Sequence, residues 1–373
     1  MKEVKEAKET QTREEIQQQA LETILRHKRC GISVSMGVGK TYIGLQYLDT
    51  LFKAAKKPNA KFLVVAPKRD IFQSWEDDAQ KFGLLYLIHH ITFSTYISLI
   101  KHHPGDYDIV ILDEAHSTKQ NHLQFLERFQ GRILGLTGTP PKWLQSEKGM
   151  IMQEYYPIVF SYKVDQAVGS GILNDYRIFV HGLELNTKNT LKTKQGWMTS
   201  ERKNYEWLRR QLEEASDKTR FMKQIFCLTA LKQYETKEQY VRQCLKKIPD
   251  DEKCLIFANT IDQAERLCDF NHHSKKKDST DLEAFKLGTI TRLSAVEQLS
   301  EGVTIPGLKH IIILHAYGNE KKASQKIGRV LRLNPNEVAK IHILQYNNTI
   351  DETWVKRALE EFNQEKIKYF KID

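Results

Sequence analysis

A glycine-rich segment near the start of the chain has the composition of a phosphate-binding loop. It reads Ser-Met-Gly-Val-Gly-Lys-Thr over residues 35–41, after a short apolar run and before a helical stretch at residues 42–52. Glycines let backbone N–H groups approach phosphates, and a following helix N-terminus favours negative charge. Lys40 would contact the β- and γ-phosphates of a nucleoside triphosphate, and the Thr41 hydroxyl would bind Mg²⁺. The strict sequence pattern of a phosphate-binding loop has glycine at the position of Val34. The alternative interpretation of this segment is therefore a simple glycine turn followed by a solvent-facing lysine.

Two adjacent acids follow the apolar run Ile109–Leu112. A carboxylate at the end of a buried strand can hold Mg²⁺, while its neighbour can orient and deprotonate an attacking water. We assign Asp113 to the metal and Glu114 to the water. An acidic strand cap is the alternative, and the presence of Lys40 upstream disfavours it.

Three polar side chains near the end of the chain share one helical face. Gln325, Arg329 and Arg332 lie at positions i, i+4 and i+7. Arginines placed in this way could reach the γ-phosphate and stabilise the charge of a phosphoryl-transfer transition state. On spacing alone, a basic helix face exposed to solvent is the favoured alternative.

Short apolar runs alternate with helical stretches, which is typical of α/β proteins with mostly parallel sheets flanked by helices. In the first half, the glycine-rich segment, Pro67, the acidic pair and Thr137–Thr139 each follow such a run. Ligands bind at the carboxyl ends of parallel strands, so these segments are expected to meet at one sheet edge. The expected strands are Ile32–Val34, Phe62–Ala66, Ile91–Phe93, Ile109–Leu112, Ile133–Leu136, Arg177–Leu185, Leu255–Ala258, Thr289–Leu293, Ile311–Leu314 and Ile341–Leu344.

The composition is that of a globular protein that could bind a polyanion. The 373 residues are enough for two ordinary domains, and 57 Lys and Arg against 47 Asp and Glu give a net charge of +10. Ordinary solubility is the alternative reading of this charge. Five scattered cysteines without a Cys-x-x-Cys pair argue against a zinc site or a disulfide framework. The first residues lack a secretory signal, and no apolar run approaches the ~20 residues that span a bilayer. We therefore expect no membrane partner and a cytoplasmic location, in a bacterium or a phage-infected host.

Eight segments occur in the order found in superfamily 2 helicases, and together they resemble that family across nearly the whole chain. The resemblance is to the DEAH-box-bearing branch that includes restriction-enzyme motor subunits, chromatin-remodelling motors and phage UvsW-like helicases. It rests on Arg13 with Gln17–Ala20, Ser35–Thr41, Val64–Lys68 with Trp75, Asp113–His116, Thr137–Pro140, Cys254–Asn259, Leu299–Pro306 and Gln325–Arg332.

The resemblance implies two tandem RecA-like lobes, residues 1–165 and 166–373, with ATP and Mg²⁺ bound between them. It implies that Asp113 and Thr41 bind the metal and that Lys40 and Glu114 act in catalysis with Gln325, Arg329 and Arg332. The implied nucleotide contacts are Gln17, Met36, Gly37, Val38, Gly39, Lys40 and Thr41.

The resemblance also implies a nucleic-acid track. Phosphates of one strand would be held by Pro67, Lys68 and Asn259, and such contacts position the protein without reading sequence. The residues implied to couple the state of ATP to this track are His116, Thr137, Thr139 and Gly302.

A basic insertion at about residues 186–225 of the second lobe carries aromatic side chains among lysines and arginines. Aromatics among cations can stack on bases or wedge a fork, which would make Trp197 and Trp207 nucleic-acid contacts. The favoured alternative is that the aromatics pack the insertion onto a lobe while the charges are solvated. We expect the insertion to be helical.

The function expected from these features is that of an ATP-dependent DNA helicase or translocase. Its partner would be single-stranded, forked or branched DNA, and it would act as a monomer or within a replication, repair or recombination complex. Three alternatives stay open: a duplex DNA translocase that does not separate strands, an RNA helicase, and a motor subunit or nucleotide-gated clamp of a larger complex.

Overall fold

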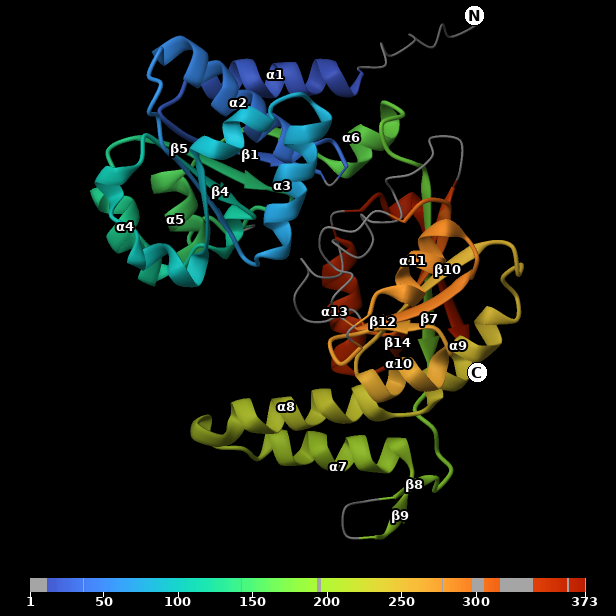
Figure 1. The fold of residues 1–373 in the computed structure, drawn as a ribbon. Helices are drawn as coiled ribbons and strands as arrows, with labels where there is room; N and C mark the ends of the chain where they lie inside the picture. Colours follow the sequence, from blue (N-terminus) through green and yellow to red (C-terminus); the bar gives the residue numbers. More distant parts are fainter. Residues whose placement is uncertain are drawn as a thin grey trace, which may run out of the picture. The chain divides into compact units, whose positions relative to one another are not determined.

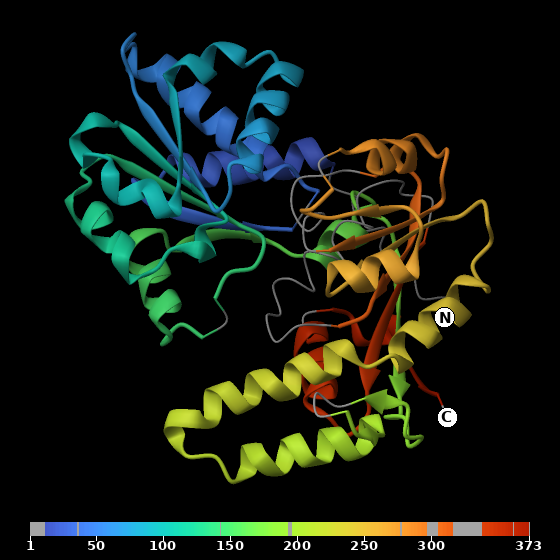
Figure 2. The same cartoon turned by 60° about the horizontal axis from the view of Figure 1, so that its bottom comes forward.

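The computed structural model describes residues 12–35, 37–141, 143–192, 196–276, 278–296, 305–315, 338–360 and 362–372. The chain divides into two compact units, Met1–Leu173 (unit 1) and Asn174–Asp373 (unit 2), and each is described separately (Figures 1 and 2). The expected lobe boundary between residues 165 and 166 stays a prediction. Five of the residues singled out above lie outside the described ranges: Met36, Gly302, Gln325, Arg329 and Arg332.

Unit 1 is built on a six-stranded sheet in the order β3-β2-β4-β5-β1-β6. Neighbouring strands are parallel throughout. β2 and β4 are buried at every position, which is expected of parallel strands with both faces covered. The strands are β1 Arg29–Val34, β2 Phe62–Ala66, β3 Ile91–Thr95, β4 Ile109–Asp113, β5 Arg132–Thr137 and β6 Ile158–Tyr162.

Helices cover both faces of the unit 1 sheet. On one face, Gly44 of α2 approaches the sheet so closely that a Cβ there would lie 3.2 Å from Leu136 Cδ1. On the other face, Ile133 joins α4 and α5 in one apolar core, because successive side chains of a strand point to opposite faces. The α-helices are α1 Arg13–Leu25, α2 Lys40–Ala55, α3 Asp70–Lys81, α4 Leu123–Arg128, α5 Glu147–Tyr155 and α6 Val164–Gly169, with short 3₁₀ helices at Leu85–His90, Tyr96–Lys101, Pro104–Asp106, Ala115–Ser117 and Gln120–His122.

Unit 2 is built on a seven-stranded sheet in the order β11-β12-β10-β13-β14-β7-β15, again with parallel neighbours. Its main core lies between this sheet and the helices α7 to α10. The strands are β7 Tyr176–Leu183, β10 Lys253–Ala258, β11 Asn271–His272, β12 Arg292–Val296, β13 Leu308–Ile313, β14 Ala339–Tyr346 and β15 Ile367–Ile372. The helices are α7 Glu201–Glu213, α8 Asp217–Gln233, α9 Thr236–Leu245, α10 Ile261–Leu267, α11 Thr280–Leu287 and α13 Ile350–Leu359, with a 3₁₀ helix at Gln364–Lys366.

The expected fold class is confirmed, and several strands are refined. β7 pairs with β14 and β15, so the strand expected at Arg177–Leu185 belongs to the unit 2 sheet. The strand expected at Thr289–Leu293 begins later, at Arg292. The reason is that Gly288, with φ 85°, ends α11, and the Thr289 N–H donates back to a carbonyl of that helix at 3.0 Å. Sequence reasoning did not predict β6 or β15.

The insertion begins with a two-stranded ribbon and becomes helical after it. β8 Leu191–Lys192 and β9 Met198–Thr199 pair in antiparallel fashion. α7 and α8 then form a hairpin that extends from the unit 2 sheet (Figure 2). Ser200 starts α7 by accepting a hydrogen bond from the Lys203 N–H, as an N-cap does. The helical part therefore starts and ends later than the predicted 186–225. No helix in the described part of the chain is both long enough and apolar enough to cross a membrane.

Candidate nucleotide site

The glycine-rich segment connects β1 to α2 at the carboxyl end of the strand. Gly37 and Gly39 have φ values of 93° and 103°, in the region where a residue with a Cβ is strained. Gly39 is the N-cap of α2, and as a glycine it has no side chain to cap this helix end. The N-cap residue therefore offers no acceptor to the N–H groups of the first turn, as suits an anionic ligand.

Gln17 of α1 braces this loop. Its side-chain Nε2 donates to the Val38 carbonyl at 2.6 Å, and the residue is buried. A Cβ at Gly39 would lie 2.5 Å from the same Nε2, which is a second reason for glycine at this position. The structure thus gives Gln17 a bracing contact that spacing could not reveal, and its expected contact with adenine stays a prediction.

The lysine and the second acid of the two motifs meet. Lys40 Nζ lies 2.9 Å from Glu114 Oε1, and their side chains are 12% and 17% exposed. Glu114 has φ 48°, a left-handed conformation that costs free energy for a residue with a side chain. Two segments 74 residues apart in sequence therefore meet at one sheet edge, as the strand-end argument predicts.

Both carboxylate oxygens of Asp113 accept hydrogen bonds. Oδ1 accepts from the Glu114 N–H at 2.8 Å, and Oδ2 accepts from the Trp75 indole Nε1–H at 2.9 Å. Burial raises the pKa of Asp113 to about 6, and the Glu114 charge adds to this, whereas Lys40 and the two hydrogen bonds lower the pKa. A buried carboxylate in a fixed orientation beside a lysine is an arrangement that a divalent cation would complete.

A chain of polar contacts leads from Glu114 to the end of β5. His116 Nδ1 lies 3.4 Å from Glu114 Oε2 and 3.0 Å from Thr137 Oγ1. The Thr137 hydroxyl also accepts a hydrogen bond from the Thr139 N–H at 3.1 Å. The three residues expected to couple ATP state to nucleic acid within unit 1 thus form one continuous series of contacts that starts at Glu114.

The residues at this edge fit a nucleoside triphosphate with Mg²⁺. Ser35 Oγ and Thr139 Oγ1 are buried without a hydrogen-bond partner in the described ranges, and such orphaned groups mark where a polar ligand or water can bind. Within those ranges no cluster of three or more His, Cys, Asp or Glu could hold a metal. Proteins bind Mg²⁺ through one or two carboxylates together with the phosphates of a nucleotide, and the Asp113 carboxylate could supply such a ligand here.

A surface depression lies beside the glycine-rich loop, between α1 and α2. Its volume is about 500 Å³. Gln46 Oε1 in its wall is buried and has no hydrogen-bond partner in the described part of the chain. Sequence reasoning did not single out Gln46, because only the packing of α1 on α2 places it beside Gln17. The lining residues are Glu14, Glu15, Gln17, Gln18, Gln19, Tyr42 and Gln46.

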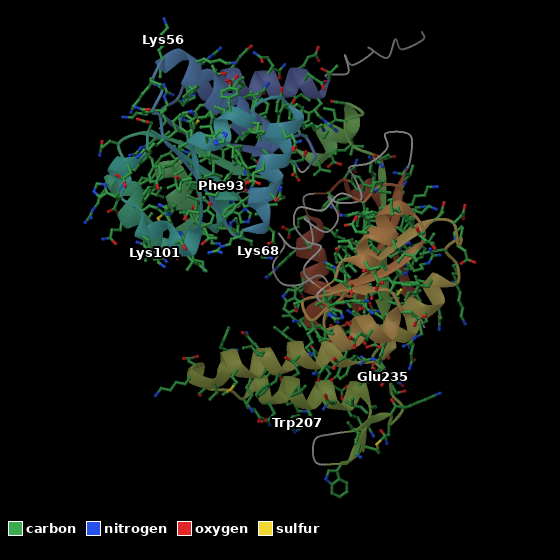
Figure 3. All side chains as sticks on the ribbon, viewed as in Figure 1. Lys56, Lys68, Phe93, Lys101, Trp207 and Glu235 are labelled. Carbon is green, nitrogen blue, oxygen red and sulfur yellow. The ribbon has the colours of Figure 1, made fainter. Side chains whose placement is uncertain are left out.

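The segments expected to contact nucleic-acid phosphates lie at strand ends. Pro67 and Lys68 follow β2, at the same edge of the unit 1 sheet as Asp113 (Lys68 is labelled in Figure 3). Asn259 follows β10 in unit 2, where its N–H and Nδ2 donate to Gln263 Oε1 at 2.9 and 3.0 Å. Their contacts with nucleic acid stay predictions.

The aromatic side chains of the insertion differ in burial. Tyr205 is 7% exposed and packs into the unit 2 core, whereas Trp197 and Trp207 are 75% and 55% exposed. Figure 3 shows Trp207 on α7. The packing alternative therefore describes Tyr205 and does not describe the two tryptophans.

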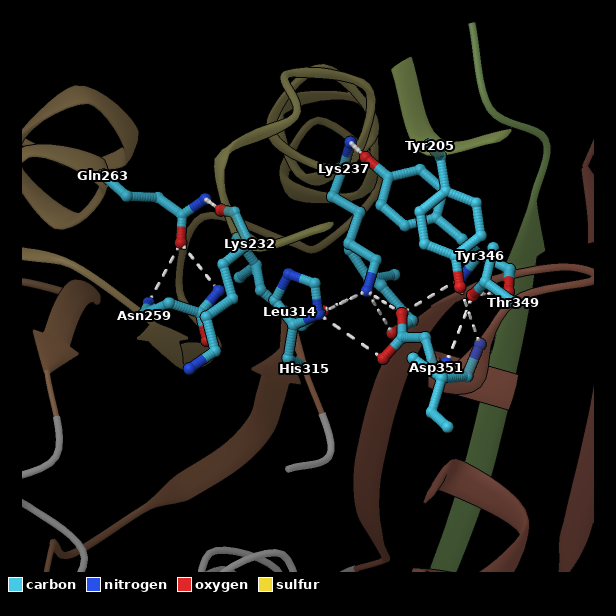
Figure 4. A network of polar contacts seen from close by, with 12 residues as sticks. Tyr205, Lys232, Lys237, Asn259, Gln263, Leu314, His315, Tyr346, Thr349 and Asp351 are labelled. Carbon is cyan, nitrogen blue, oxygen red and sulfur yellow. Dashed lines mark hydrogen bonds and ion pairs between the residues drawn. The ribbon is translucent and has the colours of Figure 1, made fainter. Parts of the chain in front are cut away.

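A second lysine–carboxylate cluster lies at the carboxyl edge of the unit 2 sheet (Figure 4). Lys237 pairs with Asp351, and its Nζ donates to the carbonyls of Leu314 and Leu344 at 2.7 and 3.0 Å. His315 Nδ1 lies 2.9 Å from the same Nζ. Burial lowers the pKa of His315 to about 4, and the Lys237 charge adds to this. Sequence reasoning missed this cluster because its members come from three distant segments without a motif.

Two sequence families match separate stretches of the chain, one in each half. The family described as type III restriction enzyme, res subunit, matches residues 10–142, and the helicase conserved C-terminal domain matches residues 236–334. The DNA 3′-5′ translocase XPB2 of Sulfurisphaera tokodaii is 22% identical over 378 residues, which cover 88% of this chain and 80% of that protein.

Solved structures show the same fold at low identity. The ATP-dependent type ISP restriction-modification enzyme LlaBIII, bound to DNA, matches 99% of this chain and 32% of its own, with a TM-score of 0.63 and 16% identity. The Hef helicase domain of Pyrococcus furiosus matches 92% of this chain and 96% of its own, with a TM-score of 0.51 and 13% identity. With two parallel-sheet units, a glycine-rich loop facing an acidic pair, and both helicase families in order, the chain belongs to the superfamily 2 helicases and translocases, which are nucleic-acid-dependent ATPases.

Proposed function

We propose that this chain is an ATP-dependent DNA translocase or helicase. The observation that carries the proposal is the Lys40–Glu114 pair, 2.9 Å apart beside Asp113 at the carboxyl edge of the unit 1 sheet. A lysine, a metal-binding acid and a water-activating acid are the protein groups that phosphoryl transfer to water requires. DNA is proposed as the partner because XPB2 is named as a DNA translocase and LlaBIII is bound to DNA. The net charge of +10 suits such a polyanion.

ATP with Mg²⁺ is the proposed cofactor pair. The backbone of residues 37–41 and the Lys40 side chain would hold the phosphates, while Thr41 and Asp113 would hold the metal. When bound, Mg²⁺ would offset the negative charge that develops on the phosphates. Lys40 would exchange its contact with Glu114 for a phosphate, after which Glu114 would orient and deprotonate the attacking water.

The depression between α1 and α2 is the proposed place for the adenine. Gln46 Oε1 could accept a hydrogen bond from the exocyclic amine, since it is buried without a partner in the described ranges. Gln17 lines the same depression and already contacts Val38. Binding of adenine in this depression could thus change the position of the phosphate-binding loop through the Gln17 side chain.

The contacts from Glu114 through His116 and Thr137 to Thr139 are proposed to couple hydrolysis to nucleic acid. They connect the water-activating acid to the loop after β5 without leaving unit 1. Gly302 is proposed to serve the same coupling, and Gln325, Arg329 and Arg332 are proposed to stabilise the transition state. These four roles are carried over from the family resemblance.

The proposed track for nucleic acid combines phosphate and base contacts. Pro67, Lys68 and Asn259 would hold phosphates, and the exposed rings of Trp197 and Trp207 would stack on bases. Exposed tryptophans are the observation that favours single-stranded or forked DNA over uninterrupted duplex, since duplex bases offer no free faces to stack on.

ATP turnover by the purified chain tests the proposal. Single-stranded DNA, duplex, a fork, a four-way junction and RNA are compared at several salt concentrations. We expect stimulation by DNA that weakens steeply as salt rises, because phosphate contacts dominate the affinity. Lys40→Ala should abolish this turnover, and a variant that turns over ATP normally with DNA present contradicts the proposal.

Strand separation and partner choice are read from the same substrates. Strand release from the fork identifies a helicase, and DNA-stimulated turnover without strand release identifies a duplex translocase. Stronger stimulation by RNA points to an RNA helicase. Negligible stimulation by every nucleic acid points to a clamp or motor subunit that needs a larger complex.

A further inference from the structure

Trp75 reaches from α3 to the carboxylate that is proposed to hold Mg²⁺. Its Nε1–H donates to Asp113 Oδ2 at 2.9 Å, and the whole side chain is buried. The other carboxylate oxygen accepts from the Glu114 N–H. One donor on each oxygen fixes both the position of the carboxylate and its rotation. Burial strengthens this bond and removes water as a competing donor.

The helix that follows the phosphate-binding loop also holds the indole ring. A Cβ at Gly44 of α2 would lie 2.6 Å from Trp75 Cη2, so α2 has a glycine where the ring packs. Trp75 therefore contacts both α2 and Asp113. Its ring fixes the spacing of the helices, and its N–H fixes the acid.

α3 connects Trp75 to the segment proposed to contact nucleic acid. Pro67 and Lys68 precede the N-cap of this helix, Arg69, and the Ile71 N–H donates to the Lys68 carbonyl at 3.4 Å. Trp75 lies seven positions after Lys68, and the helical part of this path, from Asp70 to Trp75, is about one and a half turns and ~7.5 Å of rise. A displacement at Lys68 can thus be passed to the indole through one short, continuous helix.

We propose that Trp75 is a positioning residue that couples nucleic-acid contact at Pro67–Lys68 to the orientation of Asp113. A phosphate held at Lys68 fixes α3, α3 fixes the indole N–H, and the N–H fixes the carboxylate for the metal. The proposal rests on the proposed function, because it assumes that Asp113 holds Mg²⁺ and that Lys68 meets nucleic acid. It makes Trp75 an element of regulation that acts through Asp113 and touches neither ligand.

The metal part of the proposal is tested with Trp75→Phe, which keeps a ring beside Gly44 and removes the donor. The readout is the Mg²⁺ concentration at which a fluorescent ATP analogue is half-saturated, with metal-free binding of the analogue measured alongside. We expect the Mg²⁺ requirement to rise about tenfold, the worth of one hydrogen bond to a charged acceptor, while metal-free binding stays the same. Trp143→Phe is the matched control, because Trp143 is 79% exposed in the same unit.

A second variant separates the hydrogen bond from packing. Replacing Trp75 by its benzothienyl analogue, in which sulfur stands in place of the indole N–H, keeps the shape of the side chain. The same tenfold rise is expected, even if Trp75→Phe proves too unstable to purify. A wild-type Mg²⁺ requirement in this folded analogue would overturn the proposal.

The coupling part is tested by a double-mutant cycle on DNA-stimulated turnover. Lys68→Ala and Trp75→Phe are measured singly and together, with DNA binding by the nucleotide-free protein measured directly. We expect the double variant to lose no more stimulation than the stronger single variant, since both changes interrupt one path. Independent, multiplying losses would overturn the coupling.

Failure of this inference can be told from failure of the proposed function. If the wild-type chain is stimulated by no nucleic acid, the proposed function and the coupling fall together. The shifted Mg²⁺ requirement would in that case still support a positioning role for Trp75. In the other case, DNA stimulates ATP turnover by the wild-type chain as expected, and Trp75→Phe has the same Mg²⁺ requirement and the same stimulation. That result would contradict only the inference about Trp75.

Discussion

Each unit carries a lysine–carboxylate pair at the carboxyl edge of its sheet, and the two pairs differ in how fully their polar atoms are satisfied. In unit 1, Lys40 and Glu114 are 12% and 17% exposed, and Lys40 Nζ makes one hydrogen bond within the described ranges, to Glu114. In unit 2, Lys237 and Asp351 are 1% and 0% exposed, and Lys237 Nζ also donates to two carbonyls and contacts His315.

The difference shows how to tell a binding pair from a structural pair. An ammonium group has three donors. Those of Lys237 are all used by neighbouring protein groups in the buried interior, so this ammonium has no donor left for a ligand. Lys40 is close enough to solvent to change its partner. Both are ion pairs with little exposure to solvent. Within the described ranges, only Lys40 of these two lysines still has N–H donors with which it could bind a phosphate.

The largest expected effect is on the unit 1 pair. Glu114→Gln keeps the shape of the side chain and removes the base, so DNA-stimulated ATP turnover should fall ~10²–10⁴-fold. Nucleotide affinity and thermal stability should stay close to those of the wild type, because Lys40 can still contact an amide oxygen. Single-turnover hydrolysis measures the effect, and residual turnover within tenfold of wild type would assign the base elsewhere.

The unit 2 pair should respond in the opposite way. Lys237→Met leaves Asp351 buried without its partner, which should lower the free energy of unfolding of unit 2 by about 3–5 kcal/mol. Hydrogen exchange at the amides of β13 and β14 measures this, with β1 and β4 as the internal reference. Lys40→Met is the matched control and should leave exchange in both units nearly unchanged.

A double variant tests whether the instability of Lys237→Met comes from the unpaired charge of Asp351. Lys237→Met with Asp351→Leu removes both charges, so stability should recover to within about 1 kcal/mol of wild type or exceed it. If the double variant is as unstable as Lys237→Met alone, hydrogen bonds to the strand carbonyls matter more than the charge pair.

Acid should affect unit 2 through histidines on its sheet. His181 Nδ1 lies 2.9 Å from the Tyr240 hydroxyl, and His181 Nε2 lies 3.1 Å from His342 Nδ1. Burial lowers the pKa of His181 to about 4, with the Lys247 charge adding to this, and burial lowers that of His342 to about 3. The unfolded chain therefore binds more protons, and stability is lost as the pH falls from about 6.5 towards these values.

The expected loss for His181 is about 2 kcal/mol at pH 5 relative to pH 7.5. The dependence of hydrogen exchange in β7 on pH measures it. His181→Phe, which keeps an aromatic ring, should flatten this dependence. An unchanged slope would show that His181 is not protonated when unit 2 unfolds.

The smallest effect is expected at an exposed pair on the hairpin. Arg209 and Glu213 of α7 are 3.0 Å apart, with side chains 62% and 60% exposed. Arg209→Ala should change the free energy of unfolding by no more than about 0.5 kcal/mol, because water and salt screen the pair. A loss as large as that of Lys237→Met would contradict the view that burial sets the worth of these ion pairs.

Local chemistry and periodicity were enough to predict most strands of the two sheets and the meeting of two motifs in unit 1, but not the edge strands β6 and β15. The runs Phe62–Ala66 and Ile109–Leu112 are continuously apolar because a parallel strand is buried on both faces. The residues that follow such runs must meet at one sheet edge, so the encounter of Lys40 with Glu114 could be foreseen. The coupling roles of His116 and Thr137 were predicted from the family resemblance, because their spacing in the sequence does not indicate them.

The sequence by itself therefore determined the fold class, the order of the motifs and the main groups of the proposed nucleotide site. Only the tertiary structure decided which neighbours those groups have: Trp75 on Asp113, Gln17 on Val38, and the closed cluster around Lys237. These contacts join side chains from separate elements without a shared spacing. Their geometry depends on how helices pack on a sheet, and that packing is a property of the whole core rather than of any short stretch of sequence.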